Sequence, residues 1–508
     1  MGSGPSPQAE IKGAGFCWFG RKQDLRPGDK CEVGMVFSSL LFMFRFLPVV
    51  LLLYFIAPRK IRNVILFLFS LFFYAWGEPK YVFLMLFSIT MDYTIGQAID
   101  RFKKDGHRKR AKAALLVSIA VNLGILAFFK YADFIVGSVN SLFGTAFPLP
   151  GIPLPIGISF FTFQTMSYTI DVYRGATKVQ KKWINYGTYV SMFPQLIAGP
   201  IVQYKTIAEQ MMQKDRENID DFACGVQRFM AGVGKKVLLA NNIGLLCDTV
   251  LAMPMGNVPV ATAWLGALAY TFQIYFDFSG YSDMAIGLGK MFGFHFLENF
   301  EHPYIARSIT EFWRRWHISL SSWFREYVYI PLGGNRHGAL KQVRNIFIVW
   351  MLTGIWHGAH WNYVLWGVYY GVFLILEKFV LGKWVKKLPG WLQNLYTLLI
   401  VVVGWVIFKC EDFSLAGQWL RAMFGANGAG FFNSETIYLL YNYALLLLVL
   451  ILGSTSLPKR WGERLLNCFR EGGTVQTLLK CAFCAGIFVI SVAYLVDASY
   501  NPFLYFRF

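Results

Sequence analysis

The sequence predicts an all-α membrane protein, a polytopic helical bundle with about 10–12 crossings and additional interfacial or re-entrant helices. Composition is the first observation behind this prediction: 56% of the 508 residues are hydrophobic and 18% aromatic, and only 15% are charged. An average soluble domain has about 25% charged residues. The second observation is that apolar segments of about 20 residues, enough to cross a ~30 Å hydrocarbon layer as a helix, recur along almost the whole chain.

The apolar segments set the expected order of helices. The range 345–380 is long enough for two crossings, and the ends of every segment are set only to within several residues. The expected crossings lie near residues 36–57, 62–77, 81–99, 113–129, 152–172, 186–203, 222–250, 260–290, 345–380, 392–408, 436–456 and 478–497.

The formal net charge of +19 comes from Lys and Arg in short loops beside apolar segments. This pattern indicates membrane orientation and contact with anionic lipids, and it argues against nucleic acid as the partner. The basic clusters at 59–62, 101–112 and 174–182 are all expected on the cytoplasmic side, because two crossings separate each from the next. A further basic stretch at 459–480 precedes one last crossing. Both ends of the chain are therefore expected outside the cytoplasm.

Residues 1–34 differ from the rest, because they are rich in Gly, Pro and charge and lack the apolar core of a signal peptide. We expect them to be an N-terminal extension, left by expression or by an alternative start site. The membrane domain is then 35–508, and its last residues, 498–508, form an aromatic tail.

The segment 311–327 is too charged to span a membrane, yet its apolar side chains recur with a helical period. We expect an amphipathic helix that lies along the membrane or lines a re-entrant cavity, with His317 at the border of its two faces. Arg314, Arg315 and Arg325 fall on the polar face. They suit the phosphates of a donor, but anchoring in the membrane interface is an equally good interpretation.

His357 and His360 interrupt an otherwise apolar span, and ionisable side chains at membrane depth are functional candidates by default. Gly354 and Gly358 flank His357 and would let another helix or a ligand come close. His357 is therefore the stronger candidate. A His-x-x-His pair can also bind a metal, but no third ligand is evident, so no metal site is predicted.

Asp277 and Asp283 follow another apolar run. Carboxylates in such a place must be paired, hydrogen-bonded or near water. They are candidates for orienting a histidine or substrate, and also for structural anchors that meet basic side chains.

Two histidines suit acyl transfer to a hydroxyl. A hydroxyl needs a base of near-neutral pKa to remove its proton, and histidine is the side chain that offers one. The attacked carbonyl also needs a donor as charge develops on its oxygen. His357 as base, with His317 as donor or orienting group, meets both needs.

At these residues the chain resembles the membrane-bound O-acyltransferase family and its alginate O-acetylase branch. The resemblance covers 35–508 and rests on motifs that occur in the same order, at 36–39, 155–164, 171–175, 199–200, 275–283, 312–320 and 356–359.

The resemblance implies a deep bundle with a central tunnel, His357 as the essential histidine of the family and His317 as its polar partner. It also implies a donor at the cytoplasmic mouth, with acetyl-CoA expected and no bound cofactor. An extracytoplasmic acetyltransferase partner would modify a polysaccharide such as alginate, cellulose or peptidoglycan, and the enzyme would lie in the bacterial inner membrane. The tail resembles the aromatic C-terminus of a small partner protein in the D-alanylation pathway, so Tyr505 is a candidate acyl carrier; an interfacial anchor is the alternative.

Two other functions remain open from the sequence. One is a transporter or flippase whose intramembrane His and Asp side chains relay protons or bind cargo. The other is a lipid O-acyltransferase that uses long acyl chains.

Overall fold

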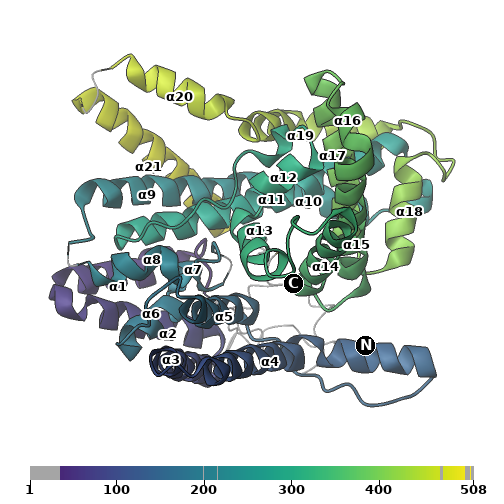
Figure 1. The fold of residues 1–508 in the computed structure, drawn as a ribbon. Helices are drawn as coiled ribbons and strands as arrows, with labels where there is room; N and C mark the ends of the chain where they lie inside the picture. The colour runs from purple at the N-terminus through teal and green to yellow at the C-terminus, as the bar shows by residue number, and fades with distance from the viewer. Residues whose placement is uncertain (1–34, 198, 214, 470–472, 498–503, 505–508) are drawn as a thin grey trace, which may run out of the picture.

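The computed structural model describes residues 35–197, 199–213, 215–469, 473–497 and 504, and within these ranges the regular structure is entirely helical (Figure 1). The N-terminal extension predicted for 1–34 lies outside the described residues. The helices of the first half are α1 (Leu47–Ile56), α2 (Arg62–Gly77), α3 (Val82–Lys104), α4 (Arg108–Phe143), α5 (Ile158–Arg174), α6 (Trp183–Ser191), α7 (Phe193–Leu196), α8 (Tyr204–Met212), α9 (Ile219–Gly234), α10 (Asn241–Leu251) and α11 (Val260–Met291). Those of the second half are α12 (Ile309–Arg315), α13 (Ile318–Phe324), α14 (Ala339–His357), α15 (Trp361–Leu376), α16 (Gly382–Val385), α17 (Gly390–Lys409), α18 (Phe413–Met423), α19 (Ser434–Gly453), α20 (Leu457–Asn467) and α21 (Thr474–Asp497).

Four π-helical turns join or extend these helices: η1 (Phe42–Phe46), η3 (Lys235–Ala240), η6 (Arg325–Tyr329) and η7 (Glu377–Leu381). η3 runs without a break between α9 and α10, so 219–251 form one long rod. Short 3-10 turns occur at η2 (Arg59–Ile61), η4 (Met255–Asn257) and η5 (Pro303–Ile305).

The protein is a membrane protein with multiple spans. Among the described residues, seven helices are long and apolar enough to cross a bilayer, and 42–56 form a shorter apolar helix. The seven are Arg59–Gly77, Val82–Lys104, Arg108–Phe143, Trp361–Val385, Gly390–Lys409, Ser434–Gly453 and Thr474–Asp497.

The crossing predicted at 186–203 is wrong. The structure has the two short helices α6 and α7 there, and the nine residues of α6 rise only about 13 Å, less than half of a bilayer core. Tyr186, Tyr189 and Phe193 are fully buried in protein. The apolar character of this segment therefore comes from packing inside the bundle rather than from contact with lipid.

Helices α9 and α11 pack closely against each other, and both use glycine where they meet. A Cβ atom at Gly232 would lie 2.6 Å from the carbonyl oxygen of Gly280, and one at Gly287 would lie 2.6 Å from that of Gly225. Small residues at such crossings let helix backbones approach within van der Waals contact. The result is a tightly packed pair in which the largely buried α11 lies against the partly exposed α9.

Two groups of charged residues serve to name the two ends of the bundle. We call one the basic end, defined by residues 101–112 and 174–182, and the other the acidic end, defined by Asp133, Asp248, Glu411 and Asp412. At the basic end Lys103 donates to the carbonyl of Val172, which closes α3 against α5. At the acidic end Asp248 lies 3.9 Å from Lys409, across α10 and α17.

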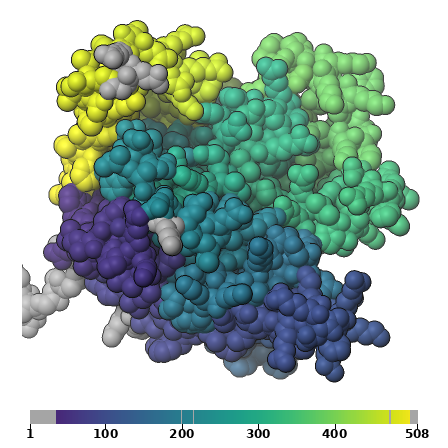
Figure 2. Space-filling model, turned by 60° about the vertical axis from the view of Figure 1, so that its left-hand side comes forward, coloured from purple at the N-terminus to yellow at the C-terminus, as the bar shows by residue number. Residues whose placement is uncertain are grey.

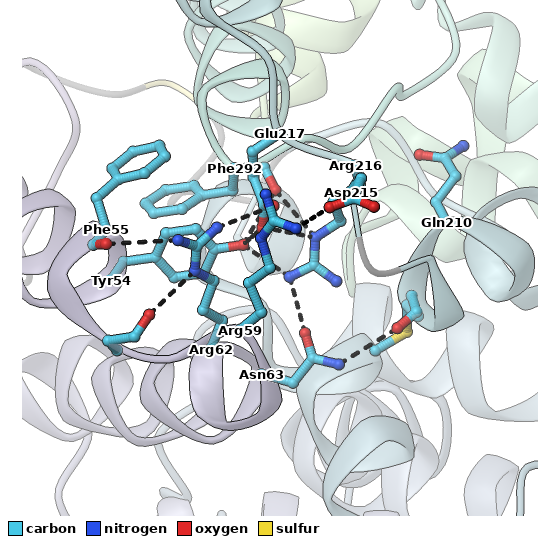
Figure 3. A network of polar contacts seen from close by, with 12 residues as sticks. Tyr54, Phe55, Arg59, Arg62, Asn63, Gln210, Asp215, Arg216, Glu217 and Phe292 are labelled. Carbon is cyan, nitrogen blue, oxygen red and sulfur yellow. Dashed lines mark hydrogen bonds and ion pairs between the residues drawn. The ribbon is translucent and has the colours of Figure 1, made fainter.

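A polar network fastens the N-terminal helices to the centre at the basic end (Figure 3). In Figure 3, Arg62 and Arg216 both point toward Glu217, with ion-pair distances of 3.0 and 3.3 Å. Arg216 also donates to the hydroxyl of Tyr54 at 2.7 Å and to the side chain of Asn63 at 2.8 Å. These contacts tie α1 and α2 to the start of α9.

The first and last described helices lie against each other, although most of the chain separates them. Figure 2 shows the purple N-terminal segment beneath the yellow C-terminal helices. The rings of Phe44 and Phe488 are 5.6 Å apart, and a Cβ at Gly234 would meet Ile487 at 2.8 Å. Helix α21 thus closes the bundle against η1 and α9.

Candidate active site

The predicted amphipathic helix 311–327 is broken in the structure at His317. α12 ends at Arg315, α13 starts at Ile318, and His317 has a left-handed backbone with φ of 45°. A non-glycine residue in this region is strained, so the surrounding contacts must hold it there. The expectation of one continuous helix is therefore wrong, although the segment does line a cavity.

Asn299 holds this break in place. Its side-chain oxygen accepts hydrogen bonds from the backbone N–H and the hydroxyl of Ser319, at 3.2 and 2.9 Å. The same oxygen lies 3.2 Å from Nδ1 of His317. Because an amide oxygen can only accept, this contact is a hydrogen bond when Nδ1 of His317 carries the proton, and that tautomer leaves Nε2 with a free lone pair. Asn299 is fully buried and was not predicted from the sequence.

His357 is the last residue of α14, directly before the extended Gly358. The predicted close approach of another helix is present: a Cβ at Gly354 would lie 2.3 Å from the carbonyl oxygen of Tyr363. His357 and His360 do not share a helix face, because α14 ends between them and His360 caps α15. His317 is 1% exposed and His357 8% exposed, whereas His360 is exposed.

The two buried histidines line one cavity of about 310 Å³, which we call the basic cavity. Its mouth carries the exposed side chains of Arg314, Arg325 and Lys378, and none of these three pairs with a carboxylate of the described residues. Within the same residues, Nε2 of His317 and Nδ1 of His357 have no hydrogen-bond partner. The basic cavity therefore runs from a cationic mouth to two buried imidazoles with unused nitrogen atoms.

Aromatic rings pack around both histidines. The ring of Trp356 lies 6.1 Å from that of His317 and 5.2 Å from that of His357. Phe278 stands edge-on to His317 at 4.7 Å, and Trp366 stands edge-on to His357 at 5.0 Å. This packing restricts the rotation of both imidazoles and gives them an apolar surrounding.

Two further cavities continue from His357 toward the acidic end. The small cavity, about 70 Å³, is lined by Lys130, Ser159 and His357, among others. The acidic vestibule, about 670 Å³, is lined by Asp133, His360, Trp361, Glu411 and Asp412, together with Lys130. The small cavity thus shares His357 with the basic cavity and Lys130 with the vestibule. Three cavities in series follow the expected course of a tunnel, with His357 between its two halves.

The structure separates the remaining candidates. Arg315 does not line the basic cavity; it pairs with Glu311 at 2.9 Å and donates to the carbonyl of Glu301. Lys378, which lines it, was not singled out in the sequence.

Neither predicted aspartate lines any of the three cavities. Asp277 pairs with the buried Lys236 at 2.6 Å, and Asp283 pairs with Arg228 and Lys235 at 2.8 and 2.6 Å. The structure thus favours the role of structural anchors over substrate binding for both.

Tyr505 lies outside the described residues, but its neighbour Leu504 is described. Leu504 is 6% exposed, and its backbone N–H donates to the carboxylate of Asp277 at 3.0 Å. Asp277 therefore meets both Lys236 and the backbone of Leu504 inside the bundle.

The multi-span helical fold suits a membrane-embedded acyltransferase. The sequence model of the membrane-bound O-acyltransferase family matches residues 154–410, which include both histidines, and the chain belongs to this family. It is 46% identical to the probable alginate O-acetylase AlgI of Pseudomonas aeruginosa over 77% of this chain and 75% of the relative. It is 41% identical to the protein of the same name from Pseudomonas putida, over 93% of this chain and the whole relative. A peptidoglycan O-acetyltransferase of Helicobacter pylori is 35% identical over 78% of this chain and 80% of the relative.

Proposed function

We propose that this enzyme takes an acetyl group from acetyl-CoA and passes it across the bacterial inner membrane for O-acetylation of an extracytoplasmic polysaccharide. The observation that carries the proposal is the position of His357, which borders a cavity with a cationic mouth on one side and leads toward an acidic vestibule on the other. Relatives named for alginate and peptidoglycan O-acetylation support acetyl as the group that is moved.

The basic end faces the cytoplasm in this proposal. Loops rich in Lys and Arg stay on the cytoplasmic side of a membrane. Over the described residues, the structure has no crossing at 186–203 and has two helices within 345–380. With these two changes, an even number of crossings separates the basic cluster 174–182 from the basic stretch 459–480. Both are therefore expected on the same side. Acetyl-CoA, a cytoplasmic metabolite, would then meet the basic cavity, whose arginines suit its phosphates because a guanidinium binds phosphate with two parallel hydrogen bonds.

The chemistry is a transfer of acetyl from sulfur to oxygen. An imidazole nitrogen of His357 takes the proton of the acceptor hydroxyl, whose oxygen then forms a bond to the carbonyl carbon of the thioester. The C–S bond breaks, and the thiolate takes the proton from the imidazolium, so the products are an acetyl ester and free CoA. His317 lies in the same cavity with Nε2 unpartnered among the described residues, and it orients the reacting groups.

The proposal is tested by following radiolabelled acetyl-CoA in membranes that contain the protein. Replacing His357 by Ala should lower the rate of acetyl transfer by about 10²–10⁴-fold, the usual contribution of a general base. His360→Ala is the matched control, because His360 is exposed in the vestibule and should have a milder effect. Near wild-type transfer by His357→Ala would overturn the assignment.

Tyr505 would carry the acetyl group between the histidine site and the partner. A phenol can hold an acyl group as a reactive ester and divide one difficult transfer into two easier ones. The buried position of Leu504 supports this role, because the residue directly before Tyr505 lies inside the bundle. A separate extracytoplasmic acetyltransferase would then place the group on the polymer.

Tyr505→Phe separates the carrier role from an interfacial anchor, because it keeps the ring and removes only the phenolic oxygen. Polymer acetylation should collapse in this variant. Mass spectrometry of the wild-type C-terminal peptide should show an acetyl adduct that is missing in His357→Ala. Full activity of Tyr505→Phe would leave the anchor as the only role of the tail.

The same labelled assay distinguishes the rival functions. Transport without a covalent acetylated product would indicate a transporter or flippase, and preference for long acyl donors would indicate lipid O-acylation.

A further inference from the structure

The C-terminal end of α14, which carries His357, is held by side chains from another helix. The last carbonyl groups of a helix have no partner within it and must be satisfied from elsewhere. Lys130 of α4 donates to the carbonyls of Trp356 and His357, at 2.6 and 3.2 Å. Its neighbour Tyr131 donates its hydroxyl to the carbonyl of Ile355 at 2.6 Å. Three consecutive carbonyls at the end of α14 are therefore bound by two adjacent residues of α4.

Lys130 is an unusual residue for this place. Its side chain is only 8% exposed, and within the described residues it forms no ion pair with a carboxylate. A buried lysine is costly in a membrane protein and marks a functional candidate. Its third contact is the hydroxyl of Ser159 at 3.4 Å, so its three N–H donors face three oxygen atoms. A positive charge at the C-terminal end of a helix also interacts favourably with the helix dipole.

We propose that Lys130 is a positioning residue that fixes His357 at the meeting point of the cavities; the proposal rests on the catalytic role given to His357 above. His357 is the last helical residue, and the chain turns away immediately after it. An unclamped last turn frays readily, and fraying here would move the imidazole itself. Lys130 also lines both the small cavity and the acidic vestibule, so the same side chain borders the passage between them.

The test uses the purified full-length protein with a neutral oligosaccharide as acetyl acceptor, and it compares Lys130→Met, Lys130→Arg and Tyr131→Phe. Lys130→Met keeps the length of the side chain but has no donor, and it should lower kcat for CoA release from acetyl-CoA by about ten- to a hundredfold, as expected for a misplaced catalytic group. The KM for acetyl-CoA should change by less than about twofold, because Lys130 does not line the basic cavity. Arginine can still donate to both carbonyls and should restore part of the rate. Tyr131→Phe releases a carbonyl two residues before His357 and should have a smaller effect.

A second measurement does not depend on activity. Diethyl pyrocarbonate modifies accessible imidazoles, and mass spectrometry reports the modification of each histidine. In Lys130→Met the modification rate of His357 should rise by about threefold or more as the last turn opens, whereas that of His360, already exposed, should stay the same. If wild-type protein releases no CoA from acetyl-CoA, the proposed function fails, while this measurement still tests whether Lys130 fixes His357.

Two results would overturn the proposal that Lys130 fixes the position of His357. One is an unchanged kcat per folded Lys130→Met molecule, with folding measured by thermal melting. The other is a loss of kcat without any change in the modification rate of His357.

Discussion

The cations at the mouth of the basic cavity give the sharpest test of where the donor binds. Arg314→Gln, Arg325→Gln and Lys378→Gln each remove one charge from the mouth. Arg315→Gln is the matched control: it removes the same charge one residue from Arg314, but from a side chain that faces Glu311. Only the first three changes should weaken binding of acetyl-CoA.

The size of the effect follows from exposure. Two unit charges about 4 Å apart attract by about 1 kcal/mol in bulk water and by about 4 kcal/mol at an effective dielectric constant of 20. The three side chains are exposed, so the lower value applies. About 1 kcal/mol per charge corresponds to about a fivefold rise in the KM for acetyl-CoA. In these variants kcat should stay the same, because the two histidines of the cavity are buried, whereas the three cations are exposed.

Steady-state CoA release at two salt concentrations measures both quantities. The Debye length falls from about 10 Å at 0.1 M salt to about 3 Å at 1 M, so the differences in KM between wild type and the three variants should shrink at high salt. Two results would refute the reasoning: an equal rise in KM for Arg315→Gln, or three variants with unchanged KM at low salt.

Two further predictions concern residues that hold the site and the fold. Asn299→Ala removes the oxygen that orients His317 and should lower kcat by about tenfold or more at unchanged KM. Asn299→Asp keeps an acceptor and should lower kcat less. Equal kcat for Asn299→Ala and wild type would contradict this prediction. Glu217→Gln removes the carboxylate shared by the half-buried Arg62 and the buried Arg216 (Figure 3). It should lower the melting temperature while kcat per folded molecule stays the same. An unchanged melting temperature would show that the network contributes nothing.

Hydropathy located most of the helices because crossing a bilayer demands both length and apolar composition. The predicted 62–77 matches α2, and 260–290 matches α11 to within one residue. The method failed at 186–203, because it does not distinguish residues buried in protein from residues in lipid. It also ended a crossing at 129, directly before Lys130, whereas α4 continues to Phe143. The lysine that interrupts the apolar pattern is the one that reaches the end of α14.

The sequence predicted the two histidines but not what holds them. His317 and His357 stand out because they interrupt apolar or amphipathic patterns, and the structure brings both to the basic cavity. Asn299 and Lys130 act through contacts with residues 18 to 227 positions away, which no local pattern reveals. The break at His317 is likewise set by Asn299 and not by a proline or glycine within 311–327.

The charge of the acidic vestibule bears on which acceptor can enter it. Asp133, Glu411 and Asp412 line it, and each would repel a polyanion such as a polyuronate by about 1 kcal/mol at close range in water. In the absence of a partner protein, neutral oligosaccharides should therefore accept labelled acetyl from the purified enzyme better than oligouronates of equal length at low salt. Neutralising the vestibule with Glu411→Gln and Asp412→Asn should narrow this difference, and the Asn keeps a side chain able to cap α18. Equal use of both acceptors by the wild type, with no change on neutralisation, would show that vestibule charge does not select the acceptor. The expected preference would support the proposed carrier and the proposed partner outside the membrane, since an anionic polymer itself would be kept away from His357.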